Sequence, residues 1–226
     1  MFIDDHSQKS WIYFLNVKSE TFDKFKEFKA LIENQISIHI RILRSDNGGE
    51  YESNEFDDFF REARIKKELI IPYKPKQNGV VERKNKIICE VVKAMLIDLD
   101  LPLSLWVEAA CTAVYIQNRS PHAILGAKTL EEVFTSKKPA VDHMRIFSTP
   151  VYVHVPKEKR AKPDPSVKKG IFAGYNDCSK AYRVYIPGQR HIKVSRDVIF
   201  REEVVFRKTL ELSTEDEVPP LEFLDS

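Results

Sequence analysis

The strongest constraint on the fold is the way hydrophobic residues change their spacing along the chain. In the first half, segments with the two-residue period of a strand alternate with segments that have the 3.6-residue period of a helix. Residues 9–18 (KSWIYFLNVK) are apolar on both alternating faces, which predicts a strand buried on both sides. Residues 36–43 (ISIHIRIL) carry isoleucine at every second position, which predicts a strand with one buried face.

Most segments outside these two predicted strands in the first half of the chain show the hydrophobic periodicity of a helix. It predicts four helices, and a short strand is expected between the second and the third. The helices are expected over residues 20–34, 54–64, from Asn78-Gly79 to about 98, and about 103–118, and the short strand over 68–71. Strands that alternate with helices indicate a layered α/β fold.

The pattern changes after Pro121. From Val151 onward, short strand-like segments follow one another closely, with turn residues at Asn176-Asp177 and Pro187-Gly188. Such spacing is typical of a small β-barrel or sandwich. We therefore expect an α/β core over 1–120, a connector over 121–147, a small barrel over 148–206 and an acidic tail over 207–226.

Composition narrows the classes of protein that need to be considered. The net charge of +2 gives no argument for a nucleic-acid partner, so such an argument has to come from local basic patches. The three cysteines lie far apart and show neither a disulfide framework nor zinc-ligand spacing. The longest apolar runs fall short of the roughly 18 residues that a membrane span requires, so no membrane contact is expected.

Two carboxylates stand out by their position. Asp46 follows the predicted strand 36–43 in the stretch RSDNGG, and Glu82 lies near the start of the long helix, on one stripe with Lys86, Cys89 and Lys93. One interpretation is structural: Asp46 belongs to the turn that ends the strand, and Glu82 is a solvent-exposed carboxylate on the helix. Alternatively, a strand-end carboxylate and a helical one can together hold Mg²⁺, which prefers hard oxygen ligands, while lysines beside them bind phosphates.

The spacing and context of these residues carry a resemblance. Thirty-five residues lie between Asp46 and Glu82, in the contexts RSDNGGEY and KQNGVVERKN. Together with FIDDHSQKSWIYFL, LPLSLWVEAACTAVYIQNRSP and PVYVHVPKEKRAKPDPSVKKGIFAGY, in this order, they resemble the integrase of copia-type LTR retrotransposons, within the retroviral integrase superfamily. The resemblance implies an RNase H-like core followed by an SH3-like β-barrel.

The resemblance also implies roles for particular residues. Asp46 and Glu82 become the second and third acidic ligands of a site for Mg²⁺ or Mn²⁺. The residues expected near DNA are Asn78 and Gly79 beside the site, Lys86 and Lys93 on the helix, and Lys157, Lys159, Arg160 and Lys162 in the basic stretch 156–169. The implied reaction is 3′-end processing and strand transfer on DNA by a homo-oligomer, inside the cell and in the nucleus.

The chain departs from the family at its start. The first catalytic aspartate of the family lies upstream of the segment that matches FIDDHS, so we expect an incomplete site, weaker metal binding and a sheet without its first strand. Asp4 and Asp5 are interpreted as turn residues and not as its replacement. Three hypotheses stay open: a fragment that a longer N-terminus completes as a transferase, a DNA-binding remnant without catalysis, and a remnant that acts through protein contacts.

Overall fold

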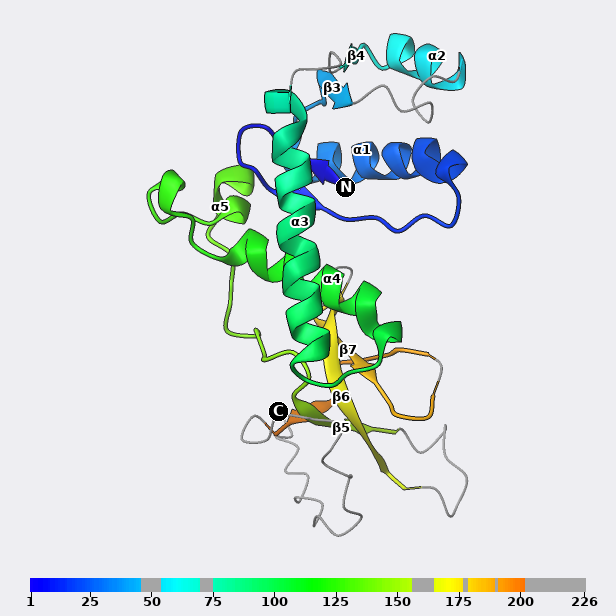
Figure 1. Ribbon diagram of the computed structural model, residues 1–226, viewed down its shortest axis with the longest axis vertical. Coiled ribbons are helices and arrows are strands. Elements are labelled where there is room, and N and C mark those ends of the chain that lie inside the picture. The colour runs from blue at the N-terminus through cyan, green and yellow to red at the C-terminus, as the bar shows by residue number, and fades with distance from the viewer. Residues whose placement is uncertain (46–53, 70–74, 156–164, 177–178, 190, 202–226) are drawn as a thin grey trace. The chain divides into compact units, whose positions relative to one another are not determined.

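The chain forms two compact units, and each is described by itself. In the computed structural model, the described residues are 1–45, 54–69, 75–155, 165–176, 179–189 and 191–201. Unit 1 contains Met1–Lys93 and Trp106–Met144, and unit 2 contains Ala94–Leu105 and the chain from Arg145 onward (Figure 1). Most of the stretch 121–147, expected as a connector, therefore belongs to unit 1.

Unit 1 is a mixed helix and strand layer, as the alternating pattern predicts. Its strands form two separate pairs among the described residues, one antiparallel (β1 with β2) and one parallel (β3 with β4). In chain order the elements are β1 Phe2–Ile3, β2 Ser10–Trp11, α1 Thr21–Ile36, β3 Ile42–Ser45, α2 Asn54–Glu62, β4 Lys66–Leu69, α3 Pro75–Ile97, α4 Trp106–Arg119 and α5 Leu130–Thr135, with short 3₁₀ turns at Lys18–Glu20, Leu103–Leu105 and Ala123–Leu125.

Aromatic residues from α1 and α2 build the core of unit 1. Phe25 of α1 and Phe56 of α2 are fully buried, and the two rings lie 6.0 Å apart. The buried members of this cluster are Phe25, Phe28, Ile32, Phe56, Phe60 and Ile65. Phe2 of β1 stacks on Phe28 at 4.3 Å, and Leu43 of β3 packs against the same cluster, so both strand pairs share one core.

Two predicted strands are wrong in extent. Of residues 9–18 only Ser10–Trp11 pair as a strand, and Leu15 and Val17 are exposed, because no second strand covers their other side in the described structure. Of residues 36–43 only Ile42 and Leu43 lie in β3. Ile36 continues the apolar stripe of α1, and Ser37 ends that helix in the left-handed conformation, so Ile38 stays 61% exposed.

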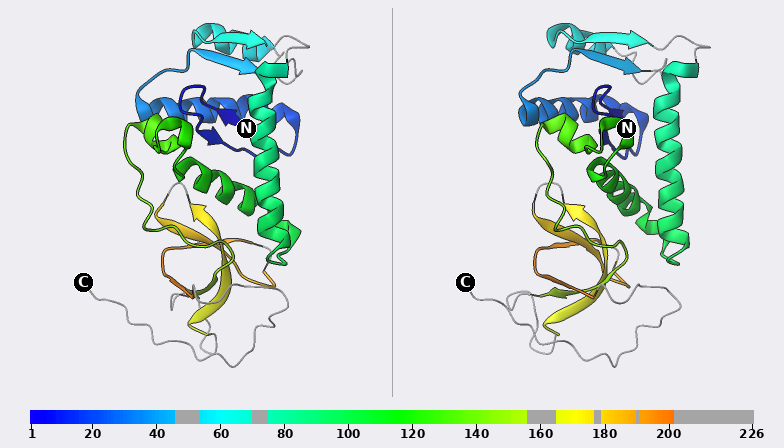
Figure 2. Two further views of the ribbon diagram at one scale, coloured as in Figure 1. Left: turned by 60° about the vertical axis from the view of Figure 1, so that its left-hand side comes forward. Right: turned by 90° about the vertical axis from the view of Figure 1, so that its left-hand side faces the viewer.

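Unit 2 contains a five-stranded antiparallel sheet. Its order is β8-β7-β6-β5-β9, and its strands are β5 Pro150–His154, β6 Val167–Asn176, β7 Ala181–Tyr185, β8 Lys193–Ser195 and β9 Val198–Phe200. The interior face carries Val151, Val153, Phe172 and Val184, all fully buried. Figure 2 shows the long strand β6 strongly bent, and its register shifts between Phe172 and Gly174. The closely spaced strands predicted after Val151 are thus confirmed.

The turn between β1 and β2, together with the first residue of β2, spans residues 4–10 (called the turn 4–10), and α4 and α5 are among the helices that form polar contacts with it. Ser10 donates its N–H to Asn118 Oδ1 of α4 at 3.0 Å and accepts from Asn118 Nδ2 at 2.8 Å. Lys9 forms a buried ion pair with Glu131 of α5, Nζ to Oε2 2.8 Å. Both Ser10 and Asn118 are buried, so these bonds satisfy groups that water does not reach.

No helix in the described parts of the chain is long and apolar enough to cross a membrane.

Asn118 is expected to contribute more to stability than an exposed asparagine. Asn118→Ala leaves the buried N–H and C=O of Ser10 without their partners, and should lower the free energy of unfolding by about 2 kcal/mol in a urea titration. Asn34→Ala, at an exposed position of α1, is the control and should change it by less than about 0.5 kcal/mol. Equal losses in both variants would contradict this role.

Glu33 should make stability depend on pH. Burial opposes its ionisation, but hydrogen bonds from Lys29, the Ile40 N–H and His39 outweigh burial and lower its pKa below 4.5. The ionised form is therefore stabilised in the folded state, and this stability is present above pH 4.5 and is lost as the pH falls through the lowered pKa.

The measurement is the difference in unfolding free energy between the natural chain and Glu33→Gln. It should be on the order of 1 kcal/mol at pH 7 and should vanish once the pH has fallen below the lowered pKa of Glu33. Glu27→Gln, on the exposed side of the same helix, should show a smaller and flatter difference. A difference for Glu33→Gln that stays constant with pH would refute the explanation.

Candidate functional site

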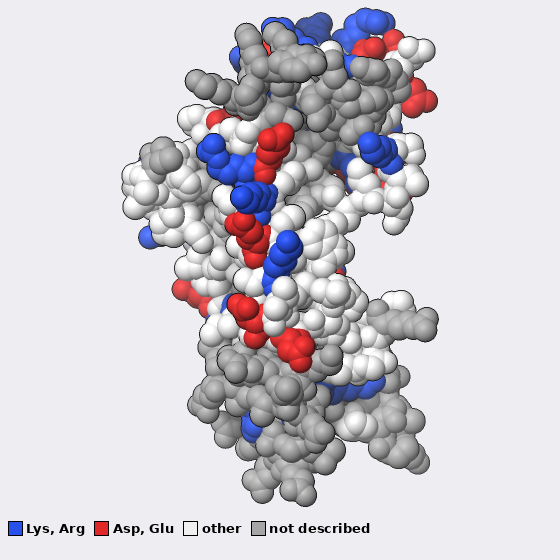
Figure 3. All heavy atoms as spheres, in the orientation of Figure 1, with Lys and Arg blue, Asp and Glu red and all other residues white. Residues whose placement is uncertain are grey.

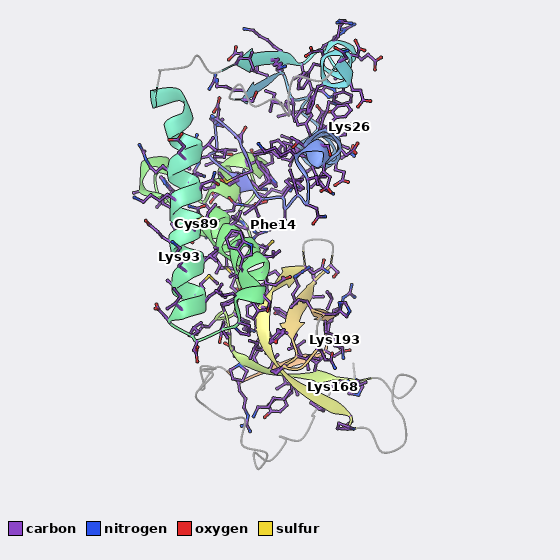
Figure 4. The ribbon with its side chains drawn as sticks, turned by 45° about the vertical axis from the view of Figure 1, so that its right-hand side comes forward. Phe14, Lys26, Cys89, Lys93, Lys168 and Lys193 are labelled. Atoms are coloured by element: carbon purple, nitrogen blue, oxygen red, sulfur yellow. The ribbon has the colours of Figure 1, made fainter. Side chains whose placement is uncertain are left out.

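Helix α3 has a buried row and an exposed face. Ile88, Val92 and Leu96, spaced four residues apart, are each at most 3% exposed and form the buried row. Glu82, Lys86, Cys89 and Lys93 are all exposed, so the stripe predicted for these four residues is indeed on the surface. Figure 3 shows acidic and basic side chains alternating along α3, and Figure 4 places Cys89 and Lys93 on this helix.

The carboxylate of Glu82 is available to a ligand. In the described part of the chain it takes part in no hydrogen bond or ion pair. Lys86 lies four residues away from both Glu82 and Glu90, and its Nζ lies 3.9 Å from Glu90 Oε1. The lysine thus leaves the Glu82 oxygens to solvent or to a cation.

The structure describes only one of the two predicted metal ligands. β3 ends at Ser45, one residue before Asp46, and Asp46 itself lies outside the described residues. Among the described residues, no group of three or more His, Cys, Asp or Glu side chains is placed to hold a metal ion. Glu82 fits a hard cation such as Mg²⁺ by its chemistry, because it offers exposed carboxylate oxygens.

The long helix predicted from Asn78-Gly79 is present and begins three residues earlier. α3 begins at Pro75, three residues before Asn78, because proline suits the first turn of a helix. Gly79 has open space where a side chain would stand. The side chain of Asn78 lies outside the described residues.

Asp4 and Asp5 have structural partners, in line with their interpretation as turn residues. Asp4 Oδ2 accepts hydrogen bonds from the Ser7 N–H at 2.7 Å and from Ser7 Oγ at 2.6 Å. Asp5 Oδ2 lies 3.1 Å from Arg44 Nη1, and Arg44 also contacts Glu68 Oε2 at 3.2 Å. Arg44 therefore links the β1–β2 turn to the β3–β4 pair.

Lys84 is the residue near the site that periodicity did not single out. It is half-buried and lies in line with the buried row of α3, one turn before Ile88; its Nζ donates to the Gln8 carbonyl and to Ser10 Oγ, the latter at 2.8 Å. Burial lowers the pKa of Lys84 to about 8. Its position four residues before Ile88 was the signal in the sequence that could have identified it.

The basic stretch predicted to contact DNA is partly described. Lys157, Lys159, Arg160 and Lys162 lie outside the described residues. A hydrogen bond from the Val155 N–H to the Ser166 carbonyl, 2.9 Å long, connects the chain just after β5 to the chain just before β6. Lys168 follows on β6 and Lys193 stands on β8, as labelled in Figure 4.

Comparison with known proteins identifies relatives of both units. The family described as "Retroviral polymerase SH3-like domain" matches residues 149–215. The chain is 43% identical over 204 residues to the retrovirus-related Pol polyprotein of transposon TNT 1-94 from Nicotiana tabacum. It is 29% identical over 202 residues to that of transposon RE1 from Arabidopsis thaliana. These matches cover 90% and 89% of the chain, but only 15% and 14% of the polyproteins.

Two solved structures are also similar in part. One is the catalytic core domain of the integrase of human T-cell leukaemia virus type 2 in complex with magnesium, with 23% identity and a TM-score of 0.46 over 58% of this chain and 80% of that one. The other is a simian T-cell lymphotropic virus intasome in complex with a PP2A regulatory subunit, with 19% identity and a TM-score of 0.49 over 91% of this chain and 70% of that one.

The sequence identity extends over nine-tenths of the chain and thus spans both units. The chain is therefore homologous, over nearly its whole length, to a segment of the retrovirus-related Pol polyproteins of copia-type transposons, and this segment includes their SH3-like module.

Proposed function

We propose that the chain is the DNA-integrating segment of a retrotransposon Pol polyprotein, with Asp46 and Glu82 as ligands of Mg²⁺ or Mn²⁺. The observation that carries the proposal is the state of Glu82. It stands exposed on α3 with no partner among the described residues, thirty-five residues separate it from Asp46, and Lys86 and Lys93 lie on the same face. The likeness to Pol polyproteins supports this assignment.

The chemistry follows from the ligand types. Bound Mg²⁺ ions would activate the attacking oxygen and stabilise the leaving oxygen of a phosphodiester. In this chain, Glu82 would offer carboxylate oxygens from a helix that packing of Ile88 and Val92 holds in place. Lys86 and Lys93 would hold the phosphate backbone beside it, and the outcome would be 3′-end processing followed by strand transfer.

Local charge supports a DNA partner where the net charge does not. Residues 145–201 contain 13 lysines and arginines against 4 acidic residues, although the whole chain carries only +2. A basic excess of this size within one segment of the chain attracts a phosphate backbone and makes binding depend on salt. We therefore propose that Lys157, Lys159, Arg160 and Lys162, which belong to this segment, bind the DNA backbone.

The site is proposed to need a further carboxylate. The resemblance expects three acidic ligands, and Asp4 and Asp5 are engaged by Ser7 and Arg44. With two carboxylates, the chain alone is expected to bind metal weakly and to lack strand-transfer activity. We further propose that the chain acts as a homo-oligomer. Its DNA partners would be the ends of the element and the target DNA, in the nucleus.

The alternative is a DNA-binding segment without catalysis. The basic excess of residues 145–201 favours it, because that charge requires no metal to act. The two functions differ in what Glu82 does: the first needs its carboxylate, and the second does not.

Substitution of Glu82 tests the metal site. Glu82→Gln keeps the shape of the side chain but removes the charge, so the affinity for Mn²⁺ in isothermal titration calorimetry should fall about tenfold or more. Glu90→Gln is the matched control, an exposed glutamate on the same helix, and should change the affinity by less than about twofold. Equal losses in the two variants would reduce the metal site to a general effect of charge.

Substitution of the two exposed lysines tests DNA contact. The double variant Lys86→Ala, Lys93→Ala should weaken binding to duplex DNA and reduce the slope of log K against log salt by about 2, since each phosphate contact contributes about 0.9. Lys137→Ala, Lys138→Ala removes the same charge at two other exposed positions and should leave the slope nearly unchanged. If both double variants reduce the salt slope by the same amount, the exposed face of α3 is not a specific DNA contact.

The two measurements together separate the functions. Loss of Mn²⁺ affinity with Glu82→Gln, combined with a DNA slope that depends on Lys86 and Lys93, supports the integrase assignment. DNA binding that ignores both Glu82 and the metal supports the non-catalytic alternative.

A further inference from the structure

One turn contacts both segments that lead to the proposed metal ligands. Residues 4–10 accept hydrogen bonds from Lys84, which lies two residues after Glu82 on α3. The same turn forms an ion pair with Arg44 of β3, which lies two residues before Asp46. The strand and the helix are far apart in the sequence. Among the described residues, neither Arg44 nor Lys84 forms a hydrogen bond or an ion pair with the other segment.

On the strand side, the connection combines an ion pair with packing. Asp5 Oδ2 lies 3.1 Å from Arg44 Nη1, and both side chains are substantially exposed, so this pair alone contributes little. Beneath it, Leu43 of β3 and Phe2 of β1 pack against the same buried aromatic cluster. A displacement of the turn therefore reaches β3 through its core as well as through Arg44.

On the helix side, the connection is a lysine in an inward position. Its Nζ donates to the Gln8 carbonyl and to Ser10 Oγ. No carboxylate lies within ion-pairing distance of it in the described part of the structure. Taking a lysine from water without an opposite charge costs free energy, and a methionine of similar length would fill the space without that cost. Stability alone therefore does not account for a lysine here.

We propose that Lys84 is a positioning residue, which through the turn 4–10 fixes the helix that carries Glu82 relative to the strand that leads to Asp46. What this positioning serves rests on the proposed function. The positioning itself is a property of unit 1 and is measurable without a metal ion.

The experiment is hydrogen exchange of the full chain, read by mass spectrometry on peptides that cover β3, the start of α3, and α1. In Lys84→Met, the peptides of β3 and of residues 79–86 should exchange at least about threefold faster than in the natural chain, while those of α1 stay unchanged. Thermal stability should stay equal or rise, because a charge that is half withdrawn from water is removed.

Lys86→Met is the matched control. It makes the same substitution two residues further along α3, at a side chain that is 78% exposed, and it should leave the exchange of all three peptides as it is. If β3 exchanges in Lys84→Met as it does in the natural chain, the inference is overturned. If α1 accelerates as much as β3, the lysine supports the whole unit and the inference is likewise overturned.

A second variant covers the case in which Lys84→Met does not fold. Ser10→Ala removes only the hydroxyl that accepts from Lys84 Nζ and leaves the backbone bonds to Asn118 in place. It should accelerate exchange in β3 in the same direction by a smaller factor. Unchanged exchange of β3 in Ser10→Ala would then count against the proposal.

Mn²⁺ affinity separates this inference from the proposed function. Removing a positive charge near Glu82 should by itself tighten metal binding, which is the result expected for Lys86→Met. Loss of position predicts the opposite sign, so Lys84→Met should bind Mn²⁺ at least about threefold more weakly. If the natural chain binds no Mn²⁺, the proposed metal site fails, and the exchange of β3 still decides the role of Lys84.

Discussion

The hydrogen bonds of Ser10 are the constraint on which the arrangement of unit 1 depends. β1 and β2 are two residues long each, and a ribbon of that length does not hold itself together in water. Its polar groups are satisfied by helices: Asn118 of α4 binds the main chain of Ser10, and Lys84 of α3 binds its hydroxyl. One buried residue therefore fixes two helices against the same turn, and the ion pair of Lys9 with Glu131 adds α5.

The sequence predicts the helices of unit 1 better than its strands, for a physical reason. A helix satisfies its own backbone, so the apolar stripe of Phe25, Phe28 and Ile32 is sufficient to locate α1. A strand needs a partner, and alternation in residues 36–43 does not show whether one is present. In the structure β3 pairs with β4 alone among the described residues, so Ile42 remains 48% exposed despite its place in an apolar pattern.

The candidate site shows the same division. The exposed stripe of Glu82, Lys86 and Lys93 could be predicted, because it follows from helical periodicity and from polar residue type. Lys84 could not be recognised from its type, since a lysine is ordinarily assigned to the surface. Its spacing with Ile88 and Val92 is the signal in the sequence that it faces inward, and the structure shows that the Gln8 carbonyl and Ser10 Oγ accept hydrogen bonds from it.

On the exposed face of α3, Lys86 forms an ion pair with Glu90 and leaves Glu82 unpaired among the described residues. A glutamate followed four residues later by a lysine is the favourable order for an ion pair on a helix, and Glu82 and Lys86 have that order. Yet the ion pair that Lys86 forms is with Glu90, in the reverse order and at 3.9 Å. The carboxylates of Asp4, Asp5, Glu33, Glu68 and Glu131 are all engaged. Glu82 has no such partner among the described residues. It is therefore the carboxylate on α3 that can accept a metal ion without breaking an existing contact in the described structure.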